Sequence, residues 1–326
     1  METTTGTPVT TTNIDIIRAG GKAPFPEVID NTYREGFTLC HQKHYWQAVA
    51  KITVDVPNIH LHAGKAFAKA LEVTRREFYE NGKSSTEAIA SGHQQLITSY
   101  GNFDEEHGYL DHAKSCANML RAFEDYFFEY SLDHSSLVPI TTADGKRGIE
   151  FSFAIPTNVL HPTTGNPILY AGRFDMLGQD ADQLWVVDEK TSSQLGQSWN
   201  SQWDLNSQFT GYCMAARHFG YPVAGAIIRG VGLLKTKISH QQAIIYRPEW
   251  QIERWWNQLH RDLKMMIALW QADHGDGSSY DFALGGACTS YGNCTYKRLC
   301  MSPTPLEWAA VGFRHNEWSP LAGFDH

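Results

Sequence analysis

Two acidic residues and a lysine near the middle of the chain form a pattern that suits phosphodiester chemistry. They occur in the segments Gly172 to Asp175 and Val186 to Thr191, both rich in residues typical of strands. Because side chains alternate along a strand, Asp188 and Lys190 lie on one face while Glu189 points to the other. Carboxylates bind Mg²⁺ or Mn²⁺ through hard oxygen atoms. A lysine ammonium can orient water and offset the negative charge that develops on phosphate.

The turn between the two strands decides whether Asp175 joins this face. The polar residues 178–182 predict a hairpin. With a two-residue turn at Asp180-Ala181, Asp175 pairs opposite Val186 and becomes a diagonal neighbour of Asp188, within bridging distance of a single ion. A loop with an odd number of residues would separate the two carboxylates unless a bulge intervened. The Asp-x-Lys motif alone also fits an ordinary ion pair on a solvated strand face, so further residues must distinguish the two interpretations.

Residues on two predicted helices extend the pattern. Gln208 and Tyr212 are four residues apart and therefore share one helical face. Upstream, Gly64 and Leu71 lie in the same predicted helix as Glu72, which could supply a third carboxylate. Taken singly, Tyr212 is equally a core aromatic residue and Glu72 a solvated helix residue. The order in which all of these residues occur is the informative feature.

In this order, the residues resemble the RecB-type branch of the PD-(D/E)XK nuclease superfamily, which includes CRISPR-associated and phage exonucleases. That branch has a Gly-x-x-x-His-x-x-Leu-Glu helix, a Gly-x-x-Asp strand, an Asp-x-Lys strand and a Gln-x-x-x-Tyr helix. The resemblance covers the chain from Cys40 to Cys300. It implies a restriction-endonuclease-like core of the α/β class, with a mixed central β-sheet flanked by helices. One departure is clear, because the histidine of the first motif is replaced by Ala68.

The resemblance also assigns roles to individual residues. Asp175 and Asp188 correspond to ligands of Mg²⁺ or Mn²⁺, together with the main-chain carbonyl of Glu189, and Lys190 corresponds to the catalytic lysine. Glu72 would complete the acidic cluster. Gln208 and Tyr212 would contact DNA or brace the site. The replacement of the histidine by alanine removes one ligand that a second metal ion would use, without affecting the three hairpin residues.

Four of the six cysteines form a second candidate site. Cys288, Cys294 and Cys300 are evenly spaced, and Cys40 lies far upstream. Four thiolates can bind either a [4Fe–4S] cluster or zinc, and spacing alone does not choose between them. The resemblance favours the cluster, because iron–sulfur RecB-like nucleases have one cysteine before the nuclease core and three after it. The first gap is longer than usual in that family, which leaves zinc or three ligands as alternatives. Cys116 and Cys213 fall in predicted helices and are expected to be core thiols.

The elements that must position these residues follow from the periodicity of the sequence. Helices are predicted over 63–80, 84–100, 109–130, 202–219 and 250–273, and strands over 148–155, 168–177, 184–191, 223–234 and 241–246. We expect a flexible N-terminal tail over residues 1–35, followed by a single nuclease domain over 36–326. This domain would contain a mainly helical elaboration (36–140), the catalytic sheet with its helices (141–275) and a Cys-rich tail (280–326).

Composition restricts the class of function. Apolar residues make up 42% of the chain, but no run of eighteen could cross a membrane. The Thr-rich start is not a secretory signal, so we expect a reducing cytoplasm. The net charge of −8 argues weakly against nucleic acid, although a bound cation reverses the sign locally and basic pairs such as Arg75-Arg76 could line a groove.

The expected activity is that of a metal-dependent deoxyribonuclease, acting as an end-processing exonuclease in recombination, repair or phage DNA metabolism. DNA is the expected partner, single-stranded or with free ends. The chain lacks a P-loop, so any helicase or recombinase would be a separate protein. No H-E-x-x-H or G-x-S-x-G motif supports another hydrolase. The alternative is a catalytically weakened protein that keeps the nuclease fold and serves as a DNA-binding or scaffold protein.

Overall fold

The computed structural model describes residues 11–289, 293–316 and 318–321. The chain folds as two compact units, and each is discontinuous in sequence. Unit 1 contains residues 1–56, 154–171 and 257–326, and unit 2 contains residues 57–153 and 172–256. These boundaries differ from those of the single nuclease domain predicted over residues 36–326. That single domain stays a prediction. All hairpin and helix residues of the predicted acidic site belong to unit 2, whereas the four candidate cysteine ligands belong to unit 1.

A mixed sheet carries the acidic motifs. Its strands follow the order β1-β5-β6-β7-β8, with β3 and β4 also paired to β5. The strands of β5–β6 and β7–β8 are antiparallel, whereas β6 and β7 run parallel. Their bounds are β1 Val28–Ile29, β3 Val138–Pro139, β4 Ile149–Leu160, β5 Pro167–Asp180, β6 Gln183–Ser192, β7 Val223–Leu233 and β8 Ile238–Tyr246. The strand β7 is almost entirely buried, which explains why its sequence is a continuous apolar run and not an alternating one.

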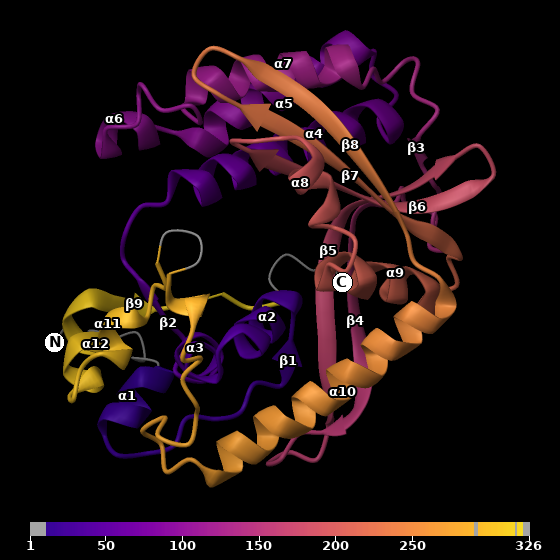
Figure 1. Cartoon of the computed structure of the whole chain (residues 1–326). Helices are drawn as coiled ribbons and strands as arrows, with labels where there is room; N and C mark the ends of the chain where they lie inside the picture. Colours follow the sequence, from indigo (N-terminus) through magenta and orange to yellow (C-terminus); the bar gives the residue numbers. More distant parts are fainter. Residues whose placement is uncertain (1–10, 290–292, 317, 322–326) are drawn as a thin grey trace, which may run out of the picture. The chain divides into compact units, whose positions relative to one another are not determined.

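Helices of unit 2 cover both faces of this sheet. They are α4 (Ile59–Tyr79), α5 (Ser85–Tyr100), α6 (Phe103–His107), α7 (Cys116–Glu129), α8 (Gln197–Ser201) and α9 (Ser207–His218). Figure 1 shows α4, α5 and α7 gathered beside β7 and β8. These three helices share an apolar core centred on Phe67 and Phe123. The predicted α/β class, with a mixed sheet flanked by helices, is confirmed and is consistent with a restriction-endonuclease-like core.

Local sequence features determine where these helices begin and how closely they pack. The side chain of Asn58 caps the first turn of α4, and Ser84 and Glu87 form a capping box at the start of α5. Gly92 of α5 permits the close approach to α4, because a Cβ there would lie 1.9 Å from Thr74 Oγ1. The 21 residues of α4 therefore pack closely against α5 while one face stays available to the sheet.

Unit 1 brings together two segments that are far apart in the sequence. It contains α1 (Asn13–Arg18), α2 (Asn31–Leu39), α3 (His41–His44), a π-helical turn (Tyr45–Val49), β2 (Ile52–Val54), a 3₁₀ turn (Gly286–Cys288), α11 (Lys297–Cys300), α12 (Pro305–Gly312) and β9 (Phe313–His315). The long helix α10 (Glu249–Ala272) enters this unit at residue 257. The strands β2 and β9 pair antiparallel, so residues 52–54 lie beside residues 313–315.

The predicted flexible tail over residues 1–35 is wrong from residue 11 onward, and residues 1–10 lie outside the described part. Thr12 and Asp15 form a capping box at the start of α1, and Ile14 and Ile17 are buried in the core of unit 1. The helix has only six residues, which explains why its periodicity is too short to recognise in the sequence. Among the described helices, none is both long and apolar enough to span a membrane.

Candidate functional site

The β5–β6 hairpin sets the relative position of the two key aspartates. Asp180 pairs with Gln183 and Met176 with Val187, so the turn consists of residues 181 and 182. The predicted turn at residues 180–181, which would place Asp175 opposite Val186, is therefore wrong: the turn lies one residue further along the chain. Away from the turn, Asp175 and Asp188 follow Met176 and Val187 along the two strands, just beyond the paired part of the hairpin. They lie close enough for the charge of Asp188 to raise the pKa of Asp175. Ala181 accommodates this turn with a φ of 50°.

A hydrogen bond and an ion pair hold the hairpin residues together. Asp175 Oδ2 accepts a hydrogen bond of 2.8 Å from the backbone N–H of Glu189. The Nζ atom of Lys190 forms an ion pair with Asp188 Oδ1. The side chain of Asp188 is 4% exposed and that of Lys190 31% exposed, so the aspartate is buried and the lysine side chain is partly exposed. Asp188 and Lys190 therefore lie on the same face, as their spacing predicts.

Burial disfavours the charged form of both aspartates. Burial raises the pKa of Asp175 well above its usual range, and the neighbouring Asp188 raises it further. Burial also raises the pKa of Asp188, although Lys190 opposes that effect. For Lys190, burial alone would lower the pKa, but Asp188 and Asp175 together raise it, so the lysine stays charged. These three residues carry one more negative charge than positive charge when all are ionised, and a divalent cation would relieve the repulsion.

The donor set suits Mg²⁺ or Mn²⁺, although it is small. Asp175 and Asp188 supply hard carboxylate oxygens, and Mg²⁺ is commonly held by one or two carboxylates with water and substrate phosphate completing its shell. Within residues 11–289, 293–316 and 318–321, no group of three or more His, Cys, Asp or Glu side chains lies close enough together to hold a metal ion. The arrangement therefore provides two adjacent carboxylates and not a complete cage of protein ligands.

The side chain of Glu189 points away from this face. Arg75 Nη1 donates to Glu189 Oε2 at 3.1 Å, Arg75 Nη2 binds Glu189 Oε1, and the Tyr126 hydroxyl donates to Oε1 at 2.8 Å. Burial would raise the pKa of Glu189, but Arg75 and then Arg229 hold it at about 2. Only the main-chain carbonyl of Glu189 is thus a candidate metal ligand. Arg75 is buried, so it does not line a DNA-binding groove as its sequence position suggested.

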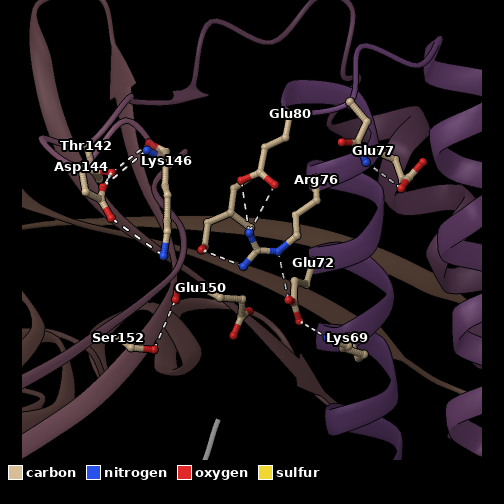
Figure 2. A network of polar contacts seen from close by, with 12 residues as sticks. Lys69, Glu72, Arg76, Glu77, Glu80, Thr142, Asp144, Lys146, Glu150 and Ser152 are labelled. Carbon is tan, nitrogen blue, oxygen red and sulfur yellow. Dashed lines mark hydrogen bonds and ion pairs between the residues drawn. The ribbon is translucent and has the colours of Figure 1, made fainter. Parts of the chain in front are cut away.

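Glu72 is engaged in ion pairs along its own helix. Lys69 Nζ lies 2.8 Å from Glu72 Oε2 and Arg76 Nε lies 3.1 Å from Oε1. Burial would raise the pKa of Glu72, but Lys69 and Arg76 together lower it. Figure 2 shows Arg76 of α4 between Glu72 and Glu80, the residue that follows the helix, with Glu150 of β4 extending into the same region. The predicted third carboxylate therefore has two cationic partners already, and its role at the metal site stays a prediction.

Glu150 is a half-buried acidic residue that sequence reasoning missed. Its side chain is 12% exposed and lies 2.8 Å from Arg173 Nε. Burial raises the pKa of Glu150 to about 7, and Glu150 in turn raises the pKa of Asp175. Its backbone has a φ of 53°, which is unusual for a residue other than glycine. A single glutamate at the start of a predicted strand carries no motif, so the sequence offers no signal for this residue.

The residues Gln208 and Tyr212 form a brace on α9. Gln208 Nε2 donates to the Tyr212 hydroxyl at 2.8 Å. The Tyr212 ring packs against Phe174 with a centroid distance of 5.5 Å. Gly172 permits this approach, because a Cβ there would lie 3.3 Å from Tyr212. The Gly-x-x-Asp strand and the Gln-x-x-x-Tyr helix are thereby packed against each other, while any contact of Gln208 or Tyr212 with DNA stays a prediction.

Ala68, which replaces the expected histidine, is half-buried on α4. A methyl side chain offers no ligand atom. The nearby histidines have other contacts: His62 Nε2 lies 3.1 Å from the Tyr100 carbonyl oxygen, and the His60 ring contacts His112. The helix therefore does not replace the missing imidazole with either of these residues.

The four predicted cysteine ligands line one small cavity in unit 1. The cavity has a volume of about 20 Å³, and its lining includes Cys40, Cys288, Cys294 and Cys300. Burial raises the pKa of the Cys300 thiol to about 11, and Cys40 is the next largest contributor. All six cysteines are free thiols. Residues 290–292, between two of the cavity cysteines, lie outside the described part of the chain.

Comparisons with known proteins identify the family. Among solved structures, the chain titled "Crystal structure of SSO0001" matches with 13% identity over 62% of this chain and 74% of that chain, but its TM-score is only 0.26. No curated protein matches. The profile of the PD-(D/E)XK nuclease superfamily matches residues 32–301, which include the hairpin, both helices with motif residues and the four cavity cysteines. Because this match spans most of the chain, the protein belongs to the PD-(D/E)XK nuclease superfamily.

Proposed function

We propose that the chain is a metal-dependent deoxyribonuclease that hydrolyses phosphodiester bonds at DNA ends. The observation that carries the proposal is the hairpin itself, in which Asp175 and Asp188 lie just beyond the residues paired between β5 and β6 and Lys190 forms an ion pair with Asp188. Charged groups are costly to bury without a function or a partner, and two adjacent carboxylates are a poor way to stabilise a sheet. They suit a cation and a phosphate substrate.

Each hairpin residue has a distinct role in this proposal. Asp175 and Asp188, with the Glu189 carbonyl, would hold Mg²⁺ or Mn²⁺, which polarises phosphoryl oxygens and lowers the pKa of bound water. Lys190 keeps its charge in the folded state because of the two aspartates. Its ammonium would orient the attacking water and offset the charge that develops on the phosphate. The hydrogen bond from the Glu189 backbone keeps the Asp175 carboxylate beside Asp188.

The test is cleavage of labelled DNA by the purified chain. Linear single- and double-stranded substrates labelled at either end are compared with circular DNA, in Mg²⁺, in Mn²⁺ and in EDTA. An exonuclease degrades the linear substrates in metal, leaves circles intact and is inactive in EDTA. Asp188→Asn should abolish cleavage, whereas Asp111→Asn, at an exposed position of unit 2, should not. Equal cleavage by the Asp188→Asn protein would contradict the proposal.

The alternative is a protein that binds DNA with a nuclease fold but cleaves weakly or not at all. Ala68 favours it, because one expected ligand is missing, and so does the absence of a third converging ligand in the described residues. The same assay separates the two functions. Tight DNA binding without cleavage in Mg²⁺ or Mn²⁺ would support the binding protein, and cleavage that requires Asp188 would exclude it.

We further propose that the cysteine cavity holds a [4Fe–4S] cluster, with zinc as the alternative occupant. The support is that Cys40 and the three downstream cysteines line one cavity. In the described residues their sulfur atoms do not form a group that could already hold a metal ion, so binding would draw the thiols together. Free thiols also suit a reducing cytoplasm, where we place the protein. Protein purified without oxygen should contain about four iron and four sulfide per chain. Cys300→Ser should reduce the iron content, whereas Cys213→Ser, in the buried part of α9, should not. One equivalent of zinc without iron would support the alternative.

The biological setting extends the proposal. DNA-end processing serves recombination, repair or phage DNA metabolism, and a chain without a P-loop would depend on a separate helicase to unwind duplex DNA. A resection assay in which a helicase is added or omitted checks this dependence. Equal degradation of long duplex DNA without any helicase would argue against it.

A further inference from the structure

A buried network lies behind the catalytic strand, on the face of β6 opposite Asp188 and Lys190. Its centre is the Glu189 carboxylate, whose side chain is 3% exposed. The two terminal nitrogens of the Arg75 guanidinium, Nη1 and Nη2, donate to the two carboxylate oxygens, and the Tyr126 hydroxyl donates to one of them. Arg229, which pairs with Glu189 in the register of β6 and β7, donates to the Tyr126 hydroxyl at 3.2 Å. Helices α4 and α7 and strand β7 are thereby tied to one residue of β6.

The same residue also contacts the metal-ligand candidates through its backbone. The N–H of Glu189 donates to Asp175 Oδ2 at 2.8 Å. Glu189 lies between Asp188 and Lys190 in the sequence, so its backbone position also places both of those side chains. A bidentate guanidinium–carboxylate pair fixes orientation as well as distance, which a single hydrogen bond does not. The side chain of Glu189 is therefore restrained on one face of β6 and its backbone amide is engaged by Asp175.

We propose that Arg75 of α4 is a positioning residue for the two aspartates, acting through its bidentate pair with Glu189. The inference rests on the proposed function, since it assigns Arg75 a part in the same metal-dependent reaction. Arg75 does not touch the substrate. It holds the β6 backbone at Glu189, and that backbone orients Asp175 beside Asp188. Groups that orient metal ligands in this way typically change metal affinity or activity by about 10- to 100-fold when they are replaced.

The expected signature separates positioning from simple stabilisation. Arg75→Lys keeps the positive charge but loses the planar, two-pronged contact. We expect a folded protein whose Mn²⁺ affinity falls about 10- to 100-fold, with a higher Mg²⁺ concentration for half-maximal cleavage and little change in the KM for DNA. Added Mn²⁺ should restore part of the activity, because the ligands are misplaced and not removed. A residue that only stabilises the fold would lower the melting temperature without changing the metal dependence.

The experiment compares the wild-type chain with Arg75→Lys, Arg75→Gln and Arg34→Lys. Arg34 is the matched control, because it is a buried arginine on α2 that forms an ion pair of 2.9 Å with Asp262 in unit 1. Circular dichroism checks folding, calorimetric titration with Mn²⁺ measures metal binding, and the cleavage assay gives kcat and KM. If Arg75→Gln does not fold, Arg75→Lys alone decides the question.

Two results would overturn the proposal. One is a folded Arg75→Lys protein whose Mn²⁺ affinity, Mg²⁺ dependence and kcat equal those of the wild type. The other is an equal loss of metal affinity in Arg34→Lys, which would mean that any buried arginine has the same effect. If the wild-type chain binds Mn²⁺ but cleaves no DNA, the proposed function fails, and weaker Mn²⁺ binding by Arg75→Lys still supports the role of Arg75.

Discussion

Replacing Asp175 by asparagine should stabilise the metal-free protein and remove its response to Mg²⁺. The pKa of Asp175 is raised well above its usual range, first by burial and then by Asp188. Asparagine removes the charge and keeps an oxygen that can accept the hydrogen bond from the Glu189 backbone. The variant therefore loses the unfavourable buried charge and retains the favourable hydrogen bond.

The direction of the effect with pH follows from the sign of the pKa change. An acid with a higher pKa in the folded state favours folding at low pH. That contribution is lost as the pH rises from the pKa of the group in the unfolded state to its pKa in the folded state. Each unit of pKa difference corresponds to about 1.4 kcal/mol. For a folding unit of 150–250 residues, each 1 kcal/mol changes the melting temperature by roughly 2–4 °C. Asp175→Asn should therefore melt at least a few degrees above the wild type at pH 8 in EDTA, and the difference should shrink toward pH 4.

Mg²⁺ should reverse this order of melting temperatures between the wild type and Asp175→Asn. A ligand at 100 times its dissociation constant stabilises the folded state by about 2.7 kcal/mol, and only the wild-type chain keeps both carboxylates that would bind it. Thermal melts at pH 8, with EDTA or with increasing MgCl₂, measure both effects, and Asp111→Asn is the control. An Asp175→Asn protein that melts at or below the wild-type temperature in EDTA would refute the account of the two aspartates.

Three further predictions concern Lys190, Glu150 and Gly92. Lys190→Ala should lower kcat about 10²- to 10³-fold with DNA affinity nearly unchanged, as measured by single-turnover cleavage and fluorescence anisotropy; undiminished cleavage would contradict its assignment. Burial raises the pKa of Glu150 to about 7. Glu150→Gln should therefore raise the melting temperature at pH 8 but not at pH 4. An equal change at both pH values would mean that the charge of Glu150 is not responsible. Gly92→Ala would place a Cβ 2.8 Å from the Ala70 carbonyl oxygen and should lower the unfolding free energy in urea by about 1–3 kcal/mol; a gain in stability would show that the two helices can move apart.

Periodicity predicts the long elements of this fold well. The helix predicted over 63–80 corresponds to α4, Ile59–Tyr79, and the strand predicted over 184–191 corresponds to β6, Gln183–Ser192. The shared face of Asp188 and Lys190 follows from the alternation of side chains and needs no long-range information. These features are local, so a single sequence suffices to find them.

Features that depend on long-range contacts could not be predicted. The hairpin register depends on Ala181 adopting a positive φ, which an alanine does not signal. The partner of Glu189 is Arg75, 114 residues away on another element, and no spacing rule connects them. The same reason applies to Glu150, whose effect on Asp175 arises only once β4 and β5 are placed in the same sheet. The order of motifs locates the site, and tertiary packing decides which neighbours complete it.

The cysteine cavity of unit 1 has a consequence for the order of events during synthesis. Cys40 is synthesised well before Cys288, Cys294 and Cys300. At about 5–20 residues per second, the interval between the synthesis of Cys40 and that of Cys288 lasts roughly 12–50 s. The whole of unit 2, which ends at residue 256, leaves the ribosome within this interval. The Cys40 thiol is therefore accessible to oxidants and free metal ions before the three downstream cysteines have been synthesised. Delivery of any occupant bound by all four thiols must follow translation of the chain as far as Cys300.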